Sequence, residues 1–219
     1  MRDAVSVAHT PRTEQRPETL QRRILKAVGR PYMRVWHHLR VEGMDRLPPH
    51  GPALVMINHT SILDVVALMA ADPYPDTAMV VKASAVRLPI VGQLLSAWYA
   101  IGIERDGRDL AGARALLAAL RHGRVVALAP EGQRSRDGHL GEISPLPGRL
   151  AVRANVPVVP VGITGSFEAL PPGAIFPRPR PIVLHVGEPL YFPNRIGDEQ
   201  AACCIRDAIA ALLPPEENG

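Results

Sequence analysis

The chain has 219 residues, of which 47% are hydrophobic and 21% are charged, so a globular domain of ordinary size is expected and extensive disorder is excluded. The net charge of +4 comes from one end, because residues 1–40 hold nine basic residues against three acidic ones and the rest hold 16 against 18. The domain itself therefore lacks the basic excess of a nucleic-acid-binding protein, and no nucleic-acid partner is expected.

The N-terminal segment begins with residues 1–17, which are polar, contain two prolines and are expected to form a loose arm. An amphipathic helical pattern follows, with an apolar stripe that includes Leu20, Ile24 and Val28 and with most of its basic residues off that stripe. Pro31 is expected to interrupt the helix before a second apolar stripe resumes. Such a basic amphipathic segment either lies in an anionic membrane interface or packs on the domain.

From residue 39 onward, short β-type runs alternate with helical patterns. This alternation predicts an α/β fold with a mostly parallel or mixed sheet and helices on both of its faces. The expected strands are 39–41, 53–57, 78–81, 100–103, 125–129, 158–163 and 182–186, and the expected helices are 62–71, 94–98, 110–122, 148–154 and 198–213. Pro157 precedes the expected strand 158–163 and Pro160 lies within it, so this strand is expected near an edge or a bulge of the sheet. We divide the chain into an N-terminal segment, residues 1–38, and a main domain, residues 39–219.

The sequence INHTSILD, residues 57–64, places a histidine at a predicted strand-to-helix turn, where open α/β sheets bind their ligands. Helical positions five apart differ by about 140° in azimuth, so His59 and Asp64 meet only if His59 precedes the helix. Asp64 would then fix the imidazole tautomer, and His59 would take a proton from a substrate hydroxyl. The alternative is purely structural: Thr60 or Ser61 caps the helix, and Ser61 with Asp64 forms a capping box.

A second polar cluster, PEGQRS, follows the predicted strand 125–129. Glycine allows a backbone to approach a ligand closely, and arginine binds anions, phosphate in particular. Glu131, Gly132, Arg134 and Ser135 are therefore candidate binding residues. The alternative is an ordinary charged surface loop.

Lys82 and Arg105 each follow a further predicted strand. If these strands are neighbours in the sheet, both cations face the same crevice as His59, which would suit a substrate that carries a phosphate. The alternative for each is a solvated surface cation.

Taken in order, these stretches resemble the sequence blocks of the glycerolipid acyltransferases, the family of 1-acylglycerol-3-phosphate and glycerol-3-phosphate acyltransferases. NHTSILD resembles the block N-H-x-S/T-x-x-D, and IGIERD resembles the second block, although the aromatic residue that usually precedes its arginine is absent. APEGQRS resembles the block P-E-G-T-R-S, with Gln133 in place of the threonine, and VPVVPV resembles the apolar block on the acyl side.

The resemblance implies transfer of an acyl group from acyl-CoA or acyl-carrier protein to a lysophospholipid hydroxyl, most simply that of 1-acylglycerol-3-phosphate, giving phosphatidic acid. It implies a catalytic pair, His59 and Asp64, that needs no metal or other cofactor. Arg105, together with Lys82 and Arg134, is expected to hold the acceptor phosphate. Glu131 and Gly132 are expected to shape the acceptor end, and Glu131 is assigned to the glycerol hydroxyl. Ser135, which also matches the block, is counted among the substrate-binding residues.

Several alternatives remain open at this point. One alternative is that the acceptor is a lyso-ornithine lipid or glycerol-3-phosphate. Another is that the chain is a non-catalytic lipid-binding protein that retains the fold.

The first 19 residues contain no apolar secretory core, and the longest uncharged run, 88–103, has 16 residues where a spanning helix needs about 20. A cytoplasmic protein attached peripherally to the inner face of the cell membrane is therefore expected, with an anionic membrane surface and acyl-carrier protein among its partners.

Overall fold

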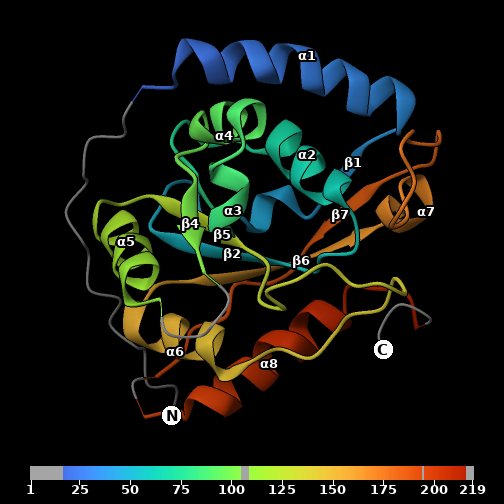
Figure 1. The fold of residues 1–219 in the computed structure, drawn as a ribbon. Coiled ribbons are helices and arrows are strands. Elements are labelled where there is room, and N and C mark those ends of the chain that lie inside the picture. Colours follow the sequence, from blue (N-terminus) through green and yellow to red (C-terminus); the bar gives the residue numbers. More distant parts are fainter. Residues whose placement is uncertain (1–16, 105–108, 194, 216–219) are drawn as a thin grey trace.

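The computed structural model describes residues 17–104, 109–193 and 195–215, which form a seven-stranded sheet with helices on both faces (Figure 1). The strands are β1 (Arg40–Glu42), β2 (Ala53–Ile57), β3 (Ala78–Lys82), β4 (Ile101–Ile103), β5 (Val125–Leu128), β6 (Val158–Thr164) and β7 (Val183–Val186). Their order is β1-β7-β6-β2-β5-β3-β4, with β6 and β7 antiparallel and the other neighbours parallel. The predicted α/β class and mixed sheet are confirmed.

The helices form layers above and below this sheet. They are α1 (Leu20–Trp36), α2 (Ile62–Ala71), α3 (Ala83–Val86), α4 (Pro89–Ser96), α5 (Leu110–Arg121), α6 (Pro145–Ala154), α7 (Ser166–Ala169) and α8 (Asp198–Ala210), with a 3₁₀ turn η1 (Met44–Arg46). In Figure 1, α2 lies on one face with α1 across it, and α5, α6 and α8 cover the other face. Among the described residues, no helix combines the length and the apolar character needed to cross a membrane.

Strand β2 lies at the centre of the sheet and is buried along its whole length. Its alternate side chains face opposite layers: Val55 and Ile57 join the cluster beneath α2, whereas Leu54 and Met56 join the cluster beneath α5, α6 and α8. A strand covered on both faces needs apolar side chains at every position, which explains why residues 53–57 form a continuous apolar run. This burial gives His59 a fixed starting point, because the chain leaves the core two residues after β2 ends.

The predicted strands agree with the observed strands to within one residue at each end. The helices agree less well, since α4 begins at Pro89 and not at residue 94. Proline suits the first turn of a helix, where the missing N–H has no intrahelical partner. The short helices α3 and α7 were not predicted, because four residues are too few to show helical periodicity.

The expectation that the strand with Pro157 and Pro160 lies near an edge of the sheet is wrong. Strand β6 lies inside the sheet, between β7 and β2. Its pairing with β7 runs from Val161 to Thr164, and a separate bridge joins Val158 to Leu190. Pro160 lies between these two stretches, so its missing N–H falls where the ladder is already interrupted.

Helix α1 differs from its prediction in two respects. It is one continuous helix that contains Pro31, capped by the Thr19 side chain, and the expected interruption does not occur. It also packs with its charged side inward: Arg22 and Lys26 are buried, while most of the apolar stripe is exposed. These two cations are therefore not available to an anionic membrane, contrary to expectation.

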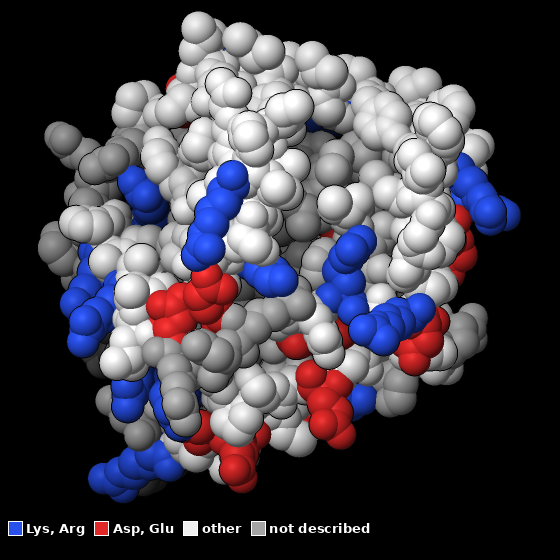
Figure 2. Space-filling view, viewed as in Figure 1, with Lys and Arg blue, Asp and Glu red and all other residues white. Residues whose placement is uncertain are grey.

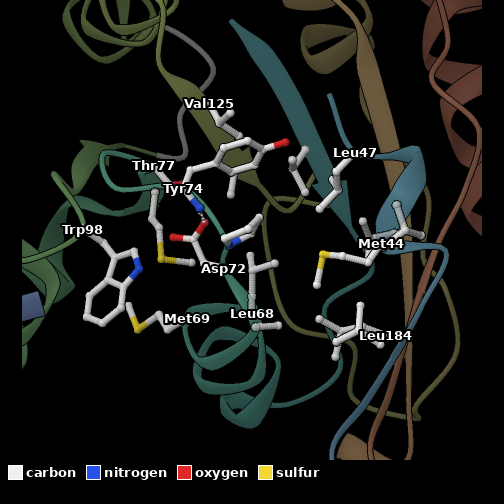
Figure 3. A pocket seen from close by; sticks show the side chains of 18 residues that line it. Met44, Leu47, Leu68, Met69, Asp72, Tyr74, Thr77, Trp98, Val125 and Leu184 are labelled. Atoms are coloured by element: carbon white, nitrogen blue, oxygen red, sulfur yellow. Dashed lines mark hydrogen bonds between the residues drawn. The ribbon is translucent and has the colours of Figure 1, made fainter. Parts of the chain in front are cut away.

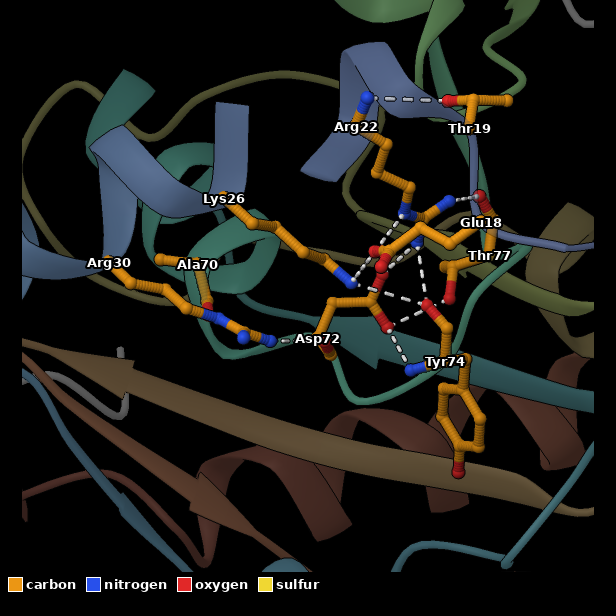
Figure 4. Close-up of polar contacts among 9 residues, drawn as sticks. All are labelled: Glu18, Thr19, Arg22, Lys26, Arg30, Ala70, Asp72, Tyr74 and Thr77. Atoms are coloured by element: carbon orange, nitrogen blue, oxygen red, sulfur yellow. Dashed lines mark hydrogen bonds and ion pairs between the residues drawn. The ribbon is translucent and has the colours of Figure 1, made fainter. Parts of the chain in front are cut away.

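A buried polar cluster explains this orientation (Figure 4). The Arg22 guanidinium pairs with the Asp72 carboxylate and donates to the carbonyls of Thr77 and Tyr74. Lys26 lies 2.8 Å from a carboxylate oxygen of Glu18 and also donates to the Tyr74 carbonyl. The loop after α2 thus offers a carboxylate and free carbonyls, and α1 supplies the donors that satisfy them.

Replacing Arg22 with alanine should lower the free energy of unfolding by about 3–5 kcal/mol, because the Asp72 carboxylate would remain buried without its cation. Urea denaturation measures this loss. Arg23→Ala is the matched control, since Arg23 lies on the same helix and is exposed. An equal, small effect of both substitutions would show that the cluster does not hold α1 in place.

Candidate active site

The site is centred on the turn between β2 and α2. His59 precedes the helix, and its Nδ1 lies 3.0 Å from Oδ2 of Asp64 in the first turn of α2. Asp64 is fully buried, whereas 18% of the His59 side chain is exposed. Ser61 forms the capping box with Asp64, so the structural and the functional interpretations of INHTSILD both describe the same turn.

The Asp64 carboxylate holds the histidine in one orientation. Its Oδ2 also accepts hydrogen bonds from the backbone N–H groups of Thr60 and Ser61, each at 2.8 Å. Because this oxygen can only accept, Nδ1 of His59 carries the proton and Nε2 is left with its lone pair. The other oxygen, Oδ1, is buried without a hydrogen-bond partner in the described part of the chain. A buried oxygen without a partner destabilises the fold. The carboxylate therefore orients His59 at a cost in folding stability.

Asn58 anchors the start of the turn to strand β6. Its side-chain amide donates to the carbonyl of Ile163 at 2.9 Å and accepts from the N–H of the same residue at 2.7 Å. The amide thereby replaces a missing stretch of sheet pairing where β2 ends. Sequence reasoning did not single out Asn58, although an amide directly before the histidine at a strand end was the available signal.

Hydroxyl groups anchor the rest of the turn to α7. Thr60 Oγ1 lies 3.1 Å from Oγ of Ser166, and Ser61 Oγ donates to the carbonyl of Leu170 at 2.9 Å. The two residues that flank His59, Asn58 and Thr60, are thus both held by side-chain hydrogen bonds. Ser61 is a cap and an anchor, and these contacts leave it no role as a nucleophile.

Glu131 ties the turn to the loop that follows β5. Its Oε1 accepts from the backbone N–H of His59 at 2.8 Å, and its Oε2 accepts from the N–H of Gly141 at 3.0 Å. The N–H of Ser135 in turn donates to the carbonyl of His59 at 2.8 Å. Both backbone groups of His59 are therefore held by one loop, residues 131–141.

Burial raises the pKa of the Glu131 carboxyl, and the hydrogen bonds from Gly141 and His59 act in the opposite direction. When the folded pKa of a carboxyl group is raised, folding stability falls as the pH rises from the unfolded pKa to the folded pKa. This cost indicates that Glu131 serves the geometry of the site. The oxygens of Glu131 bind the backbone N–H groups of His59 and Gly141, whereas the sequence predicts a contact with a glycerol hydroxyl.

The other candidates in this loop have distinct surroundings. Ser135 Oγ donates to Asp137 at 2.7 Å and accepts from the N–H of Gly138, so the hydroxyl shapes the loop. Gly132 has a φ of 69°, a conformation that favours glycine. Arg134 is exposed. The loop thus brings Glu131 and Ser135 to His59 through backbone contacts and leaves the Arg134 cation in solvent.

Lys82 and Arg105 are the two candidates on neighbouring strands. Lys82 ends β3 and is exposed, at the same carboxyl edge as His59 but two strands away. Arg105 lies outside the described residues. It follows β4, which is adjacent to β3, by two positions in the chain.

Neither of two cavities in the described part of the chain is lined by His59. One, of about 40 Å³, is an apolar space between α2 and the sheet lined by residues such as Leu68, Trp98 and Leu184 (Figure 3). It has room for only a few water-sized groups, so a long acyl chain would require side chains to move. The other, of about 530 Å³, lies between the loop 131–142 and Arg206 of α8. Within the described residues, no group of three or more His, Cys, Asp or Glu side chains is arranged to hold a metal.

Comparisons with known proteins identify the family of the chain. A family model described as acyltransferase matches residues 38–164, more than half of the chain. A 1-acyl-sn-glycerol-3-phosphate acyltransferase of Chlamydomonas reinhardtii is 30% identical over 194 residues, covering 84% of this chain and 55% of the relative. A chloroplastic enzyme of the same name from Arabidopsis thaliana is 28% identical over 163 residues, covering 66% of this chain and 45% of the relative. The chain spans about half the length of the curated relatives it matches.

One solved structure shows the same fold. The 1-acyl-sn-glycerophosphate acyltransferase PlsC of Thermotoga maritima superposes with a TM-score of 0.74 at 23% sequence identity. The match covers 86% of this chain and 76% of the other. At this identity the likeness concerns the fold, with its mixed sheet and flanking helices.

Replacing Glu131 with glutamine should lower kcat by about tenfold to a hundredfold with little change in the acceptor KM, because glutamine has one accepting oxygen and cannot hold both His59 and Gly141 in place. Steady-state kinetics with varied acceptor measures the two constants. Glu142→Gln, an exposed acid in the same loop, is the control. A rise in the acceptor KM with kcat retained would instead support the expected contact with the glycerol hydroxyl.

Proposed function

The chain belongs to the acyltransferase family, and we propose that it transfers a fatty acyl group from an acyl thioester to the hydroxyl of a lysophospholipid, with 1-acylglycerol-3-phosphate as the preferred acceptor. The observation that carries this proposal is the His59–Asp64 pair, with a buried carboxylate on Nδ1 and a partly exposed ring. The printed names of the relatives support the choice of acceptor.

The reaction is a direct transfer without an acyl-enzyme. His59 Nε2 takes the proton of the acceptor hydroxyl as its oxygen attacks the thioester carbonyl carbon, and a tetrahedral oxyanion forms. The carbon–sulfur bond then breaks, and the leaving thiolate receives the proton from the imidazolium. Asp64 stabilises the imidazolium throughout. A base placed in this way typically contributes about 10² to 10⁴ in rate.

The backbone contacts of His59 support this role. A base must keep its nitrogen within hydrogen-bond reach of the acceptor oxygen, and small displacements cost rate. Both backbone groups of His59 are hydrogen bonded, and Asp64 holds the ring. Glu131 acts in this proposal as a positioning residue, because its oxygens bind backbone amides.

Three cations are proposed to hold the acceptor phosphate: Lys82, Arg105 and Arg134. Their support is that each follows a parallel strand at the carboxyl edge that carries His59. The side chains of Lys82 and Arg134 are exposed. Gly132 and Ser135 give the loop its shape around them.

The acyl donor in this proposal is acyl-CoA or acyl-carrier protein, since the chemistry at the thioester is the same for both. No step requires a metal or another cofactor. The acceptor and the product are membrane lipids, so the proposed place of work is the inner face of the cell membrane, with the protein attached peripherally.

Purified protein with labelled acyl-CoA, or with acyl-carrier protein as donor, should acylate 1-acylglycerol-3-phosphate in preference to glycerol-3-phosphate and lyso-ornithine lipid. His59→Ala should lower turnover at least about a hundredfold and leave the melting temperature nearly unchanged, because the ring supplies the base. His122→Ala, an exposed histidine at the end of α5, is the control. Lipid binding without turnover for any acceptor would favour the non-catalytic alternative.

Arg105→Ala should raise the acceptor KM about tenfold or more with little change in the thioester KM, because a charge-assisted contact to phosphate contributes roughly 1.5–3 kcal/mol. The assay varies 1-acylglycerol-3-phosphate at saturating donor. Arg121→Ala is the matched control, since Arg121 is an exposed arginine at the end of α5. An unchanged acceptor KM would remove Arg105 from the phosphate site.

A further inference from the structure

We propose that the hollow of about 530 Å³ between the loop 131–142 and α8 binds the phosphopantetheine arm of the acyl donor. We call this hollow the donor pocket. Acyl-CoA and acyl-carrier protein both carry the acyl group on this arm, which contains a phosphodiester, amides and a hydroxyl and ends in the thiol. The proposal rests on the proposed function, because that function supplies the thioester donor.

The donor pocket adjoins the catalytic turn, although His59 does not line it. Two of its lining residues, Glu131 and Ser135, are the ones that hold the backbone N–H and the carbonyl of His59. The rest of the wall is the continuation of the same loop together with Arg206 of α8. In Figure 1 this loop, in yellow, runs beside α8. A ligand in the donor pocket therefore has one end beside the turn that carries the base.

The loop that forms the donor pocket is braced by its own hydrogen bonds. Ser135 Oγ donates to a carboxylate oxygen of Asp137 at 2.7 Å, and the N–H of His139 donates to the same oxygen at 3.2 Å. Leu140 is buried in the core cluster that also contains residues of α8. The walls are thus formed before a ligand arrives, which lowers the entropy cost of binding.

The lining excludes two parts of the donor. Among the described residues that line the donor pocket, Leu140 is the one large apolar side chain, and there is no phenylalanine, tyrosine or tryptophan. An acyl tail would therefore bury little apolar surface here, and an adenine base would have no aromatic ring to stack on. The part of the donor that suits a polar hollow is the arm between them.

Two arginines in the lining suit the phosphodiester of the arm. Arg136 belongs to the loop and Arg206 to α8, so they approach the donor pocket from different elements. Guanidinium groups bind phosphate oxygens through paired N–H donors. Within the described chain, the exposed Arg136 side chain has no hydrogen-bond or ion-pair partner, so it is available to a ligand.

The acidic residues of the lining leave these cations available. Glu131 accepts from two backbone N–H groups, and Asp137 accepts from a hydroxyl and an N–H of its own loop. Basic and acidic side chains lie side by side in the lower half of the face drawn in Figure 2, where this loop lies in Figure 1. A mixed lining of this kind matches a ligand with one anionic group and several neutral polar groups.

The topology keeps the donor pocket apart from the proposed phosphate site of the acceptor. Lys82 and Arg105 follow β3 and β4, whereas the donor pocket adjoins α8, which packs against β6 and β2. Arg134, the third proposed cation, does not line the donor pocket. A direct transfer needs donor and acceptor bound at the same time, and two separate sites at one edge of the sheet allow this.

Arg136→Ala should raise the KM for acyl-CoA about tenfold with little change in the acceptor KM, because a charge-assisted contact to phosphate is lost. The assay varies the donor at saturating 1-acylglycerol-3-phosphate. It is repeated with acyl-carrier protein, with acyl-phosphopantetheine and with acyl-pantetheine, which lacks the phosphate. The KM should rise for every donor that carries the phosphate and stay unchanged for acyl-pantetheine. Arg153→Ala, an exposed arginine of α6 outside the donor pocket, is the matched control.

An equal loss with acyl-pantetheine, or no loss with any donor in an active protein, would overturn the proposal. An effect confined to acyl-CoA would overturn it in favour of a nucleotide site, and one confined to acyl-carrier protein in favour of a contact with the carrier's surface. Calorimetric titration with unacylated phosphopantetheine separates the two proposals, since Arg136→Ala should bind it about tenfold more weakly than the parent. If the parent binds it but acylates no acceptor, only the proposed function fails.

Discussion

The interaction on which the site depends is the set of three hydrogen bonds to one oxygen of Asp64. The same Oδ2 accepts from the His59 ring and from the backbone N–H groups of Thr60 and Ser61. The capping contacts fix the carboxylate to the first turn of α2, and the carboxylate then fixes the ring. The geometry of the histidine therefore follows from how the helix begins, and the turn cannot be a helix cap without also orienting His59.

The turn is held in place by contacts from distant parts of the chain. Asn58 binds Ile163 of β6, and Glu131 joins His59 to Gly141 after β5. Because β6 and β5 are the two neighbours of β2, each neighbour contributes one anchor at the same edge. The parallel arrangement makes this possible, since all three strands end on the same side. The base is thus assembled from a local motif and positioned by the sheet.

How far the sequence predicts these features depends on how local they are. The strand at 53–57 and the pair His59 and Asp64 were predictable, because a buried run and a spacing of five residues are both visible in a short window. The role of Glu131 was not, because its partners lie 72 and 10 residues away and are backbone amides. A backbone amide is present at almost every position and leaves no mark in the sequence.

Helix α1 shows the same limit in another form. A helical pattern predicts that one side is apolar, but it does not say which side faces the protein. Here the choice is made by Asp72 and by carbonyls of the loop after α2, which only donors such as Arg22 can satisfy. Buried charges usually add little net stability, yet breaking one pair is costly, so they select one orientation strongly. The contacts that turn the charged side of α1 toward the protein therefore keep its apolar face directed away from the core.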